Sequence, residues 1–421
     1  MLFSLKNLVY HILRNYPWTL GSQRRLLMTT LDRKNLDKSI KRALKNVPFY
    51  KDYMISLDES GHIDLQQFPI IRKKELVGKE PLLVSKKYCK KLLKRAKTGG
   101  TSGVSLKLYQ SIFTILRKNV VANKGLREIG GVKKMAILRG YRPKKGKIYE
   151  QLLSGDIIMS SYRLLPQYVD EYLNILRSNN IECIQAYPSS IIILARMIKQ
   201  KYGLAKLPKL KGIFVSSESF TDIDRNFVSS VFPNVKIVNY YGQNELVCCA
   251  LRIGDEPFVF YPNFGYVEFV PTGEQTSEGN EICEIVATSI LNKAMSLIRY
   301  GTEDYVSIDK DGKVTNILGR QSDFAVNKLG QILPCTLLTR EVSMKNVTNF
   351  QFYQPEIGKM VFRVVVNKLF GDADKKLLEE DLKGSFGEDM ECVVDVRDNI
   401  ERTKAGKQRR LIQDFIVHDY L

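Results

Sequence analysis

Histidine is scarce in this sequence: of 421 residues only His11, His62 and His418 are histidine, and none of them lies in a candidate motif. Catalysis by a Ser-His-Asp or Cys-His arrangement and a histidine-rich metal centre are therefore disfavoured. No Gly-Lys pair is followed by Ser or Thr, so a Walker A loop is excluded. No Gly-x-Gly spacing occurs, so the dinucleotide-binding fingerprint is excluded as well.

Cysteine is also used sparingly and without pattern. The count of seven is odd, and no C-x-x-C spacing occurs. A disulfide framework is disfavoured, and a reducing cytoplasm is the predicted compartment. Cys248, Cys249 and Cys283 could form a degenerate metal site, but no histidine is nearby, so we interpret them as buried small hydrophobes and expect no zinc.

Long apolar runs are missing too. No run reaches the roughly 18 residues that span a bilayer, and the N-terminus does not resemble a secretory signal. Leu5, Leu8, Val9 and Ile12 recur at helical spacing. This pattern fits a helix lying on a membrane or, in our preferred interpretation, a helix packing on its own protein.

Positive charge is in excess. Hydrophobic residues make up 44% and charged residues 26%, which is ordinary for a globular protein, but the formal net charge is +20. Such an excess indicates an anionic partner without naming it. Nucleotide, coenzyme A, nucleic acid and an acidic membrane surface all remain open at this point.

The pattern along the chain predicts an α/β plus α+β protein of two domains. Residues 1–320 form the large domain: 1–95 mostly helical, with helices at 36–44 and 88–96; 96–250 α/β with a largely parallel sheet; and 251–320 rich in strands. Residues 321–421 form a small α+β domain. Helices are predicted at 112–129, 165–178, 190–202, 222–231 and 373–384, and strands at 135–138, 181–184, 212–216, 235–238, 359–366 and 392–396.

Five short motifs carry the chemistry. Lys97 to Ser105 reads KTGGTSGVS, whose glycines and hydroxyls suit a phosphate-binding nest. Tyr240 to Glu245 reads YYGQNE and follows a strand, where α/β folds place ligands; its carboxylate suits magnesium. Arg299 to Asp304 reads RYGTED, with an Asp that can accept from a ribose diol. Gly319 to Asp323 reads GRQSD, and Ile400 to Arg410 reads IERTKAGKQRR, with a lysine that could reach a phosphate. Each motif alone also fits a surface turn or a solvated loop.

The ordered set resembles the adenylate-forming ligases, a superfamily that includes acyl-CoA synthetases and nonribosomal-peptide adenylation domains. Within it, the sequence is most similar to the phenylacetate-CoA ligase and capsular-polysaccharide-biosynthesis branch. Val47 to Tyr50, Phe68 to Ile70, Gln185 to Ser189 and Ser216 to Glu218 add to the likeness, which runs from about residue 45 to the C-terminus.

The resemblance implies roles for individual residues. Contacts to the β- and γ-phosphates are expected from Thr98, Thr101, Ser102 and Gly103. The adenine is expected beside Ser217, Glu218 and Tyr240, and the acyl group beside Tyr187, Pro188, Tyr241 and Gly242. Glu245 would bind Mg²⁺, Asp304 would clamp the ribose with help from Arg320, and Lys407 would bridge the carboxylate and the α-phosphate. Ser322 and Asp323 would form the hinge of a mobile C-terminal domain.

Four positions depart from the usual pattern of the family. Val104-Ser105 replaces Lys-Pro, Asn244 replaces Thr or Ser, Glu303 replaces the Gly before the ribose Asp, and Ser322 replaces the first Asp of the hinge. The first and last of these bear on rate and domain motion rather than on the basic activity.

The predicted reaction is attack of a carboxylate on the α-phosphate of ATP, followed by transfer of the acyl group to a thiol or amine. Such chemistry needs positioning and charge neutralisation rather than a histidine base. Coenzyme A and a sugar- or carrier-linked amine are both left open as acceptors, as is an aryl or small organic acid as substrate. The preferred setting is surface-polysaccharide synthesis in the cytoplasm, with peripheral membrane contact left open.

Two rival classes are a basic nucleic-acid-binding protein, which should show a basic stripe with interleaved aromatics, and a non-catalytic membrane-associated scaffold. The lysines are scattered along the chain, and no nucleic acid is expected as a partner.

Overall fold

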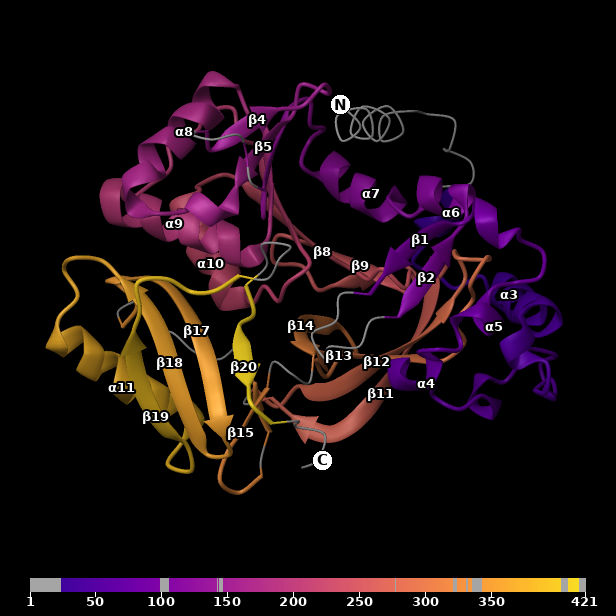
Figure 1. The fold of residues 1–421 in the computed structure, drawn as a ribbon. Coiled ribbons are helices and arrows are strands. Elements are labelled where there is room, and N and C mark those ends of the chain that lie inside the picture. Colours follow the sequence, from indigo (N-terminus) through magenta and orange to yellow (C-terminus); the bar gives the residue numbers. More distant parts are fainter. Residues whose placement is uncertain are drawn as a thin grey trace. The chain divides into compact units, whose positions relative to one another are not determined.

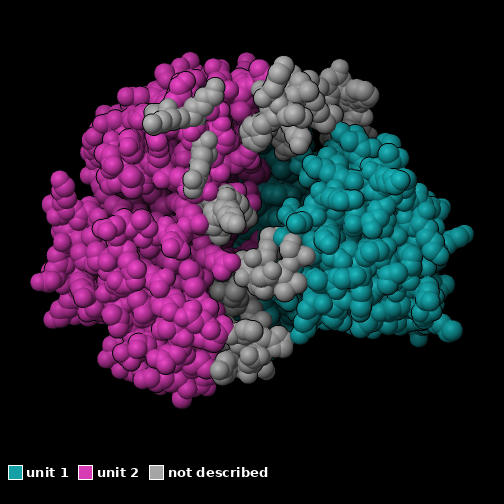
Figure 2. Space-filling view, viewed as in Figure 1, with its two compact units in different colours: residues 1–131, 238–316 teal, residues 132–237, 317–421 magenta. Residues whose placement is uncertain are grey.

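The structure is a computed structural model that describes residues 24–98, 106–141, 143, 147–276, 278–320, 324–330, 332–334, 343–402 and 408–415 (Figure 1). It divides into two compact units, each built from two separate stretches of the chain (Figure 2). The first unit comprises residues 1–131 and 238–316, and the second comprises residues 132–237 and 317–421. The predicted domain boundary at residue 320 remains a prediction, although the break at 316–317 falls close to it. The predicted N-terminal helix at residues 5–12 lies outside the described residues.

Helix α3 (Arg33–Asn46) lies near the start of the described part of the first unit and contains the predicted helix at 36–44. Asp32 caps it, because its side chain accepts a hydrogen bond from the Asn35 backbone N–H at 3.1 Å. Leu36 and Ile40 recur at helical spacing and are buried. The short helices that follow are η2 (Pro48–Tyr50), η3 (Leu65–Gln67), α4 (Lys73–Leu76), α5 (Glu80–Leu83) and η4 (Lys90–Leu92).

The predicted helix at 88–96 is wrong. Only the single turn η4 forms there, and β1 (Lys94–Lys97) then pairs antiparallel with β2 (Lys107–Gln110). Lys, Leu and Arg have good helix propensity, but propensity is a weak prior that ladder pairing with a neighbouring strand overrides. The predicted helix at 112–129 is confirmed as two pieces, α6 (Ile112–Arg117) and α7 (Val120–Glu128).

Strands dominate the rest of the first unit, as the sequence predicted for residues 251–320. β8 (Lys236–Gly242) pairs antiparallel with β9 (Cys249–Ile253), and β9 with β10 (Val259–Phe260). A second sheet pairs β11 (Gly265–Gln275), β12 (Glu281–Ser289) and β13 (Tyr300–Ile308) in antiparallel order. β14 (Val314–Arg320) follows across the boundary between the units.

The second unit contains the predicted parallel sheet. Its strands lie in the order β7-β6-β3-β5-β4, and all but the edge strand β4 are parallel. They are β3 (Met135–Arg139), β4 (Tyr149–Gln151), β5 (Ile157–Ser160), β6 (Cys183–Ala186) and β7 (Gly212–Ser216). Helices α8 (Val169–Ser178), α9 (Pro188–Tyr202) and α10 (Asp222–Val231) connect or follow them close to the predicted positions, together with the turns η5 (Ser161–Arg163) and η6 (Pro166–Tyr168).

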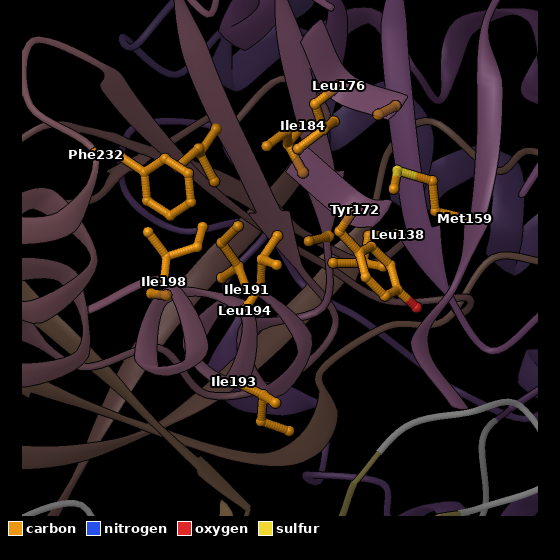
Figure 3. Packing of buried hydrophobic residues seen from close by; sticks show 14 of the residues in the cluster. Leu138, Met159, Tyr172, Leu176, Ile184, Ile191, Ile193, Leu194, Ile198 and Phe232 are labelled. Atoms are coloured by element: carbon orange, nitrogen blue, oxygen red, sulfur yellow. The ribbon is translucent and has the colours of Figure 1, made fainter. Parts of the chain in front are cut away.

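An apolar cluster between this sheet and its helices forms the core (Figure 3). Ile191, Leu194 and Ile198 recur at helical spacing on α9 and are buried beside Ile184 of β6 and Phe232 after α10. α9 has buried residues on most of its surface, which explains why its sequence is nearly continuous in Ile, Leu and Ala.

The C-terminal segment has a hydrophobic core of its own. A sheet in the order β19-β18-β17-β20 packs against α11 (Asp372–Phe386). Phe352, Phe362 and Phe386 are buried between them, with ring centroids 4.8 Å apart for the first two. The strands are β17 (Val347–Glu356), β18 (Lys359–Val366), β19 (Glu391–Val396) and β20 (Leu411–Gln413), and a small hairpin of β15 (Phe324–Val326) and β16 (Ile332–Pro334) precedes them.

Within the second unit, Arg410 ties this segment to α10. Its guanidinium forms a two-pronged ion pair with the Asp224 carboxylate at 3.0 and 3.1 Å, and its Cζ lies 5.6 Å from the Phe350 ring centroid. Arg196 of α9 stacks on the same ring at 5.1 Å. Burial alone would raise the pKa of Asp224, but Arg410 holds it below its ordinary value. A buried carboxylate therefore depends on an arginine that comes almost 190 residues later in the chain.

Arg410→Ala is expected to lower the free energy of unfolding by about 3 kcal/mol near neutral pH, because it leaves Asp224 buried without its main partner. A depressed carboxylate pKa stabilises the fold above the ordinary pKa of the group and loses this effect as pH falls through the folded value. The cost of the substitution should therefore persist down to about pH 4 and shrink only below it. Urea unfolding near neutral pH and at about pH 3 measures the change, with the exposed neighbour Arg409→Ala as control; equal costs for the two variants near neutral pH would contradict the prediction.

Candidate functional site

Two of the predicted motifs meet in the first unit around Asp304. The Tyr241 hydroxyl donates to Asp304 Oδ2 at 2.7 Å, and Gln243 Nε2 donates to the same oxygen at 2.6 Å. Asp304 is 6% exposed and lies on β13, whereas the two donors lie at the end of β8. The YYGQNE and RYGTED segments, 60 residues apart, therefore build one polar centre whose carboxylate is held in a fixed orientation.

Glu245 adds a second buried carboxylate to this centre. It is 5% exposed, and the Tyr300 hydroxyl of the RYGTED segment donates to its Oε1 at 3.4 Å. The buried Cys248 thiol lies close to both acidic groups: burial raises its pKa most, and the charges of Asp304 and Glu245 raise it further. Both carboxylates thus lie in the surroundings of the buried Cys248 thiol.

The base of the predicted phosphate loop joins the same centre. Thr98 N–H donates to Leu106 O at 3.0 Å, and Leu106 N–H donates to Thr98 Oγ1 at 2.9 Å, which closes the chain on either side of residues 99–105. Asn244 Nδ2 donates to Lys97 O at 3.0 Å, and Gln110 Nε2 donates to Asn244 O at 3.2 Å. Three motifs that are distant in sequence are therefore joined within one unit.

The structural roles of Gln243 and Asn244 were not predicted from the sequence. Both lie inside the YYGQNE motif, but only the tertiary contacts show that Gln243 holds Asp304 and that Asn244 holds the base of the loop. The only indication of these roles in the sequence is the amide group itself, which can both donate and accept hydrogen bonds.

The backbone around this centre is held in sparsely populated conformations. Leu246, Arg299 and Glu303 have positive φ angles of 57°, 45° and 60° although none is glycine. Residues in this region persist where the surrounding structure enforces them, and they cluster at functional sites. At Gly242, a Cβ atom would lie 2.6 Å from the Tyr240 hydroxyl oxygen, so this position also needs the small residue.

Glu303, which the sequence analysis contrasted with the glycine expected from the resemblance, has a φ of 60°, a backbone conformation that favours glycine. Glu303→Gly should raise the free energy of unfolding by about 0.5–1 kcal/mol, because relief of the left-handed backbone outweighs the entropy that glycine adds to the unfolded chain. Chemical denaturation measures the change. Glu281→Gly, at the exposed start of β12, is the control and should be destabilising; a loss of stability in both variants would contradict the prediction.

The second unit places another group of predicted residues at the carboxyl edge of its parallel sheet. Tyr187 and Pro188 follow β6, and Ser217 and Glu218 follow β7. Ligands of open α/β sheets bind at this edge. Tyr187 is half-buried, and burial raises the pKa of its hydroxyl. Ser217 has a φ of 76°, a strained conformation for a residue other than glycine.

Glu218 is a junction between three segments of this unit. Its carboxylate accepts from the Ser189 N–H at 2.9 Å, at the N-terminus of α9, and from the Gln408 N–H at 3.0 Å, in the C-terminal segment. Burial raises the pKa of Glu218, and these hydrogen bonds oppose the rise. Arg402 lies near the carboxylate; burial lowers the pKa of Arg402, and the charge of Glu218 opposes that shift. The residue predicted to border the adenine thus caps a helix and holds the segment that follows Lys407.

Several predicted residues lie outside the described residues: Thr101, Ser102 and Gly103 of the loop, Ser322 and Asp323 of the hinge, and Lys407. Arg320 ends β14, and only its backbone is described. Their predicted roles remain predictions. Tyr240 lies on β8 beside Tyr241.

Glu245 is the candidate ligand for the predicted magnesium ion. Among the described residues, no group of three or more His, Cys, Asp or Glu side chains could hold a metal on its own. Magnesium is usually bound through one or two carboxylates together with substrate phosphates. The buried Glu245 carboxylate therefore fits an ion that arrives with a nucleotide. Cys248, Cys249 and Cys283 are buried with raised thiol pKa values, in agreement with their predicted role as small hydrophobes.

Known proteins resemble this chain over most of its length. A solved 2-hydroxyisobutyryl-CoA ligase in the postadenylation state, in complex with R3-HIB-AMP, matches with a TM-score of 0.67 and 14% identity, covering 95% of this chain and 94% of the other. The chain has the fold of the adenylate-forming CoA ligases. The same ligase with 2-HIB-AMP and CoA in the thioesterification state gives a TM-score of 0.53 at 15% identity, covering 96% and 95%. The anthranilate CoA ligase AuaEII with anthranoyl-AMP gives 0.52 at 11% identity, covering 77% and 67%.

Known proteins also resemble this chain in sequence. The phenylacetate-coenzyme A ligase of Pseudomonas putida is 23% identical over 334 residues, 74% of either chain. Residues 327–414 match the CapK C-terminal domain, within the small domain predicted at 321–421. The predicted fold class and the resemblance to adenylate-forming ligases of the phenylacetate-CoA ligase and capsular branch are confirmed.

Proposed function

We propose that this protein activates a carboxylic acid with ATP as an acyl-adenylate, releases pyrophosphate, and transfers the acyl group to a thiol or amine. The observation that carries the proposal is the centre in the first unit, where the segments of Asp304, Glu245 and Thr98 are joined by hydrogen bonds. The similar proteins are acid–CoA ligases with bound acyl-AMP, which agrees with a nucleotide at such a centre.

Each buried group has a task in this reaction. Asp304 accepts hydrogen bonds from the ribose hydroxyls, and Tyr241 and Gln243 keep its carboxylate oriented for them. Glu245 holds the magnesium ion, which neutralises phosphate charge when bound. Thr98, with Thr101, Ser102 and Gly103, contacts the phosphates, and Arg320 assists at the ribose.

The remaining residues position the substrate and the catalytic lysine. Tyr240, Ser217 and Glu218 border the adenine, while Tyr187, Pro188 and Gly242 border the acyl group. Because the Glu218 carboxylate accepts from Gln408 N–H, it is one of the groups of the second unit that hold the chain next to Lys407. Lys407 bridges the carboxylate and the α-phosphate, and Ser322 and Asp323 form the hinge of the C-terminal domain at residues 321–421.

Two observations bear on the acceptor and the setting. The similar 2-hydroxyisobutyryl-CoA ligase in the thioesterification state contains CoA, which supports a thiol acceptor. The match of residues 327–414 to the CapK C-terminal domain supports surface-polysaccharide synthesis, where an amine on a sugar or carrier is the acceptor. Use of ATP fits a cytoplasmic protein. Among the described residues, no helix combines the length and apolar character needed to traverse a bilayer.

Acid-dependent exchange of pyrophosphate into ATP tests the proposal directly. A broad panel of aliphatic, hydroxylated and aromatic acids should contain at least one that supports exchange in the presence of Mg²⁺. Adding coenzyme A, and separately amino sugars, then distinguishes thioester from amide formation. Absence of exchange with every acid, in protein that is folded and that binds no ATP, would reject the proposal.

A further inference from the structure

The first unit contains a long stretch of one charge sign whose lysines and arginines have no role in the proposed chemistry. Residues 81–127 contain no Asp or Glu and twelve Lys or Arg. Most of them lie in a short segment around η4 and β1, where the exposed cations are Lys86, Lys87, Lys90, Lys91, Lys94, Arg95 and Lys97. Sequence reasoning treated the lysines as scattered, and this concentration corrects that interpretation.

Large apolar side chains are exposed in this segment and at the start of the neighbouring helix α6. Leu92 is 83% exposed, and Phe113 and Ile112, at the start of α6, are 67% and 59% exposed. The β1–β2 ladder brings them together: Lys94 pairs with Gln110, so Leu92 and Ile112 each lie two residues beyond the same end of the ladder. Lys90 Nζ lies 5.1 Å from the Tyr109 ring centroid, which confirms that η4 lies against the end of β2. Figure 1 shows β1, β2 and α6 side by side.

The positive charge continues around this apolar tip. Lys94 is close enough to Lys118, after α6, to lower the pKa of the Lys118 amine, although burial contributes more. Lys293 lies among Arg42 and Lys38 of α3 and Arg117 of α6, and their charges add to the effect of burial in lowering its pKa. The elements η4 and β1 and the start of α6 thus form one surface, the basic face, which carries the exposed lysines together with Leu92, Ile112 and Phe113.

We propose that the basic face docks on the surface of an anionic lipid bilayer. Clustered lysines and arginines attract acidic headgroups, and protruding Leu, Ile and Phe side chains enter the boundary between headgroups and acyl chains. Both features are present here on neighbouring elements. A nucleic acid fits the basic face less well, because a protein surface that binds single strands usually presents several exposed aromatic side chains on which the bases stack. On the basic face Phe113 is exposed, whereas Tyr109 is 5% exposed.

The proposal extends beyond the proposed function and does not depend on it. Acyl transfer at a membrane surface would suit an acceptor carried by a lipid, but vesicle binding can be measured with no substrate present. A protein that fails to catalyse exchange and still binds vesicles would leave this inference standing, and an active ligase without vesicle binding would overturn it.

Co-sedimentation of the full chain with vesicles is the test. Vesicles of phosphatidylcholine mixed with phosphatidylserine should bind the protein, vesicles of phosphatidylcholine alone should bind it poorly, and added salt should weaken binding. The triple variant Lys87→Gln, Lys91→Gln and Lys94→Gln should bind about tenfold or more weakly. The double variant Leu92→Ser and Phe113→Ser should bind about tenfold more weakly as well.

Matched controls come from the C-terminal segment. Lys368, Lys375 and Lys376 are exposed, so their replacement by Gln removes the same charge elsewhere, and Leu369, which is 78% exposed, gives in Leu369→Ser a control for Leu92→Ser alone. These controls should bind like the unmodified protein, and thermal unfolding verifies that every variant is folded. Equal losses in the control variants would overturn the proposal. So would binding of single-stranded RNA that is lost in the lysine variant and kept in the Leu92→Ser and Phe113→Ser variant.

Discussion

Glu245→Gln is expected to lower acid-dependent ATP–pyrophosphate exchange by about a hundredfold or more. The substitution keeps the size of a side chain that is 5% exposed and retains an acceptor for the Tyr300 hydroxyl, but it removes the negative charge that holds the metal. Exchange rates at increasing Mg²⁺ measure the effect. Because a metal ligand rather than a packing residue is lost, excess Mg²⁺ should restore part of the rate.

Glu256→Gln is the matched control, since Glu256 is an exposed glutamate after β9 in the same unit. It should leave exchange unchanged. If Glu245→Gln retained the rate of this control at every Mg²⁺ concentration, Glu245 would not be a metal ligand. If it lost activity together with its thermal transition, the loss would be structural, and the Mg²⁺ titration would then show no recovery.

Lys407→Ala is expected to reduce the same exchange by about two to three orders of magnitude, because a cation that bridges the carboxylate and the α-phosphate stabilises charge that develops in the transition state. Transfer of the acyl group from chemically prepared acyl-adenylate to the acceptor should fall much less, since that step needs no contact from this lysine. The two half-reactions are measured separately, by exchange and by consumption of the adenylate.

Lys404→Ala, three residues earlier in the same basic segment, distinguishes a specific contact from general positive charge. It should retain most of both half-reactions. Equal loss in Lys404→Ala and Lys407→Ala would indicate that the segment acts through its summed charge. Loss of adenylate consumption as large as the loss of exchange would contradict the assignment of Lys407 to the first step alone.

Much of the local secondary structure could be predicted from the sequence. α9 begins with Pro188, and α10 begins after the capping residue Thr221, as the usual signals for a helix start predict. Ile191, Leu194 and Ile198 of α9 repeat at helical spacing. The strands β3, β6 and β7 were evident as short apolar runs, because a sheet buried on both faces leaves no room for polar side chains. The order of motifs was sufficient to predict the ligase fold.

Other helices and strands could not be predicted from the sequence, because they are stabilised by partners that are distant in sequence. The stretch 88–96 has the composition of a helix, yet Lys94 to Lys97 form a strand because β2 supplies a ladder. β5 was missed although Ile157, Ile158 and Met159 form a buried apolar run of the same kind as those of β3, β6 and β7. β17 and β20 were missed because they pair in parallel across about 60 residues, and nothing local marks either partner.

The sequence by itself determined which chemical groups are available: a hydroxyl-rich loop, two acidic motifs, a terminal lysine and a large excess of positive charge. Only the tertiary structure decided which of them meet. It joined Tyr241 and Gln243 to Asp304, gave Glu218 the backbone N–H of Gln408, and placed Leu92 and Ile112 at the same end of the β1–β2 ladder. The physical reason is that side-chain chemistry is a property of each residue, whereas proximity follows from how buried apolar surface brings strands and helices together.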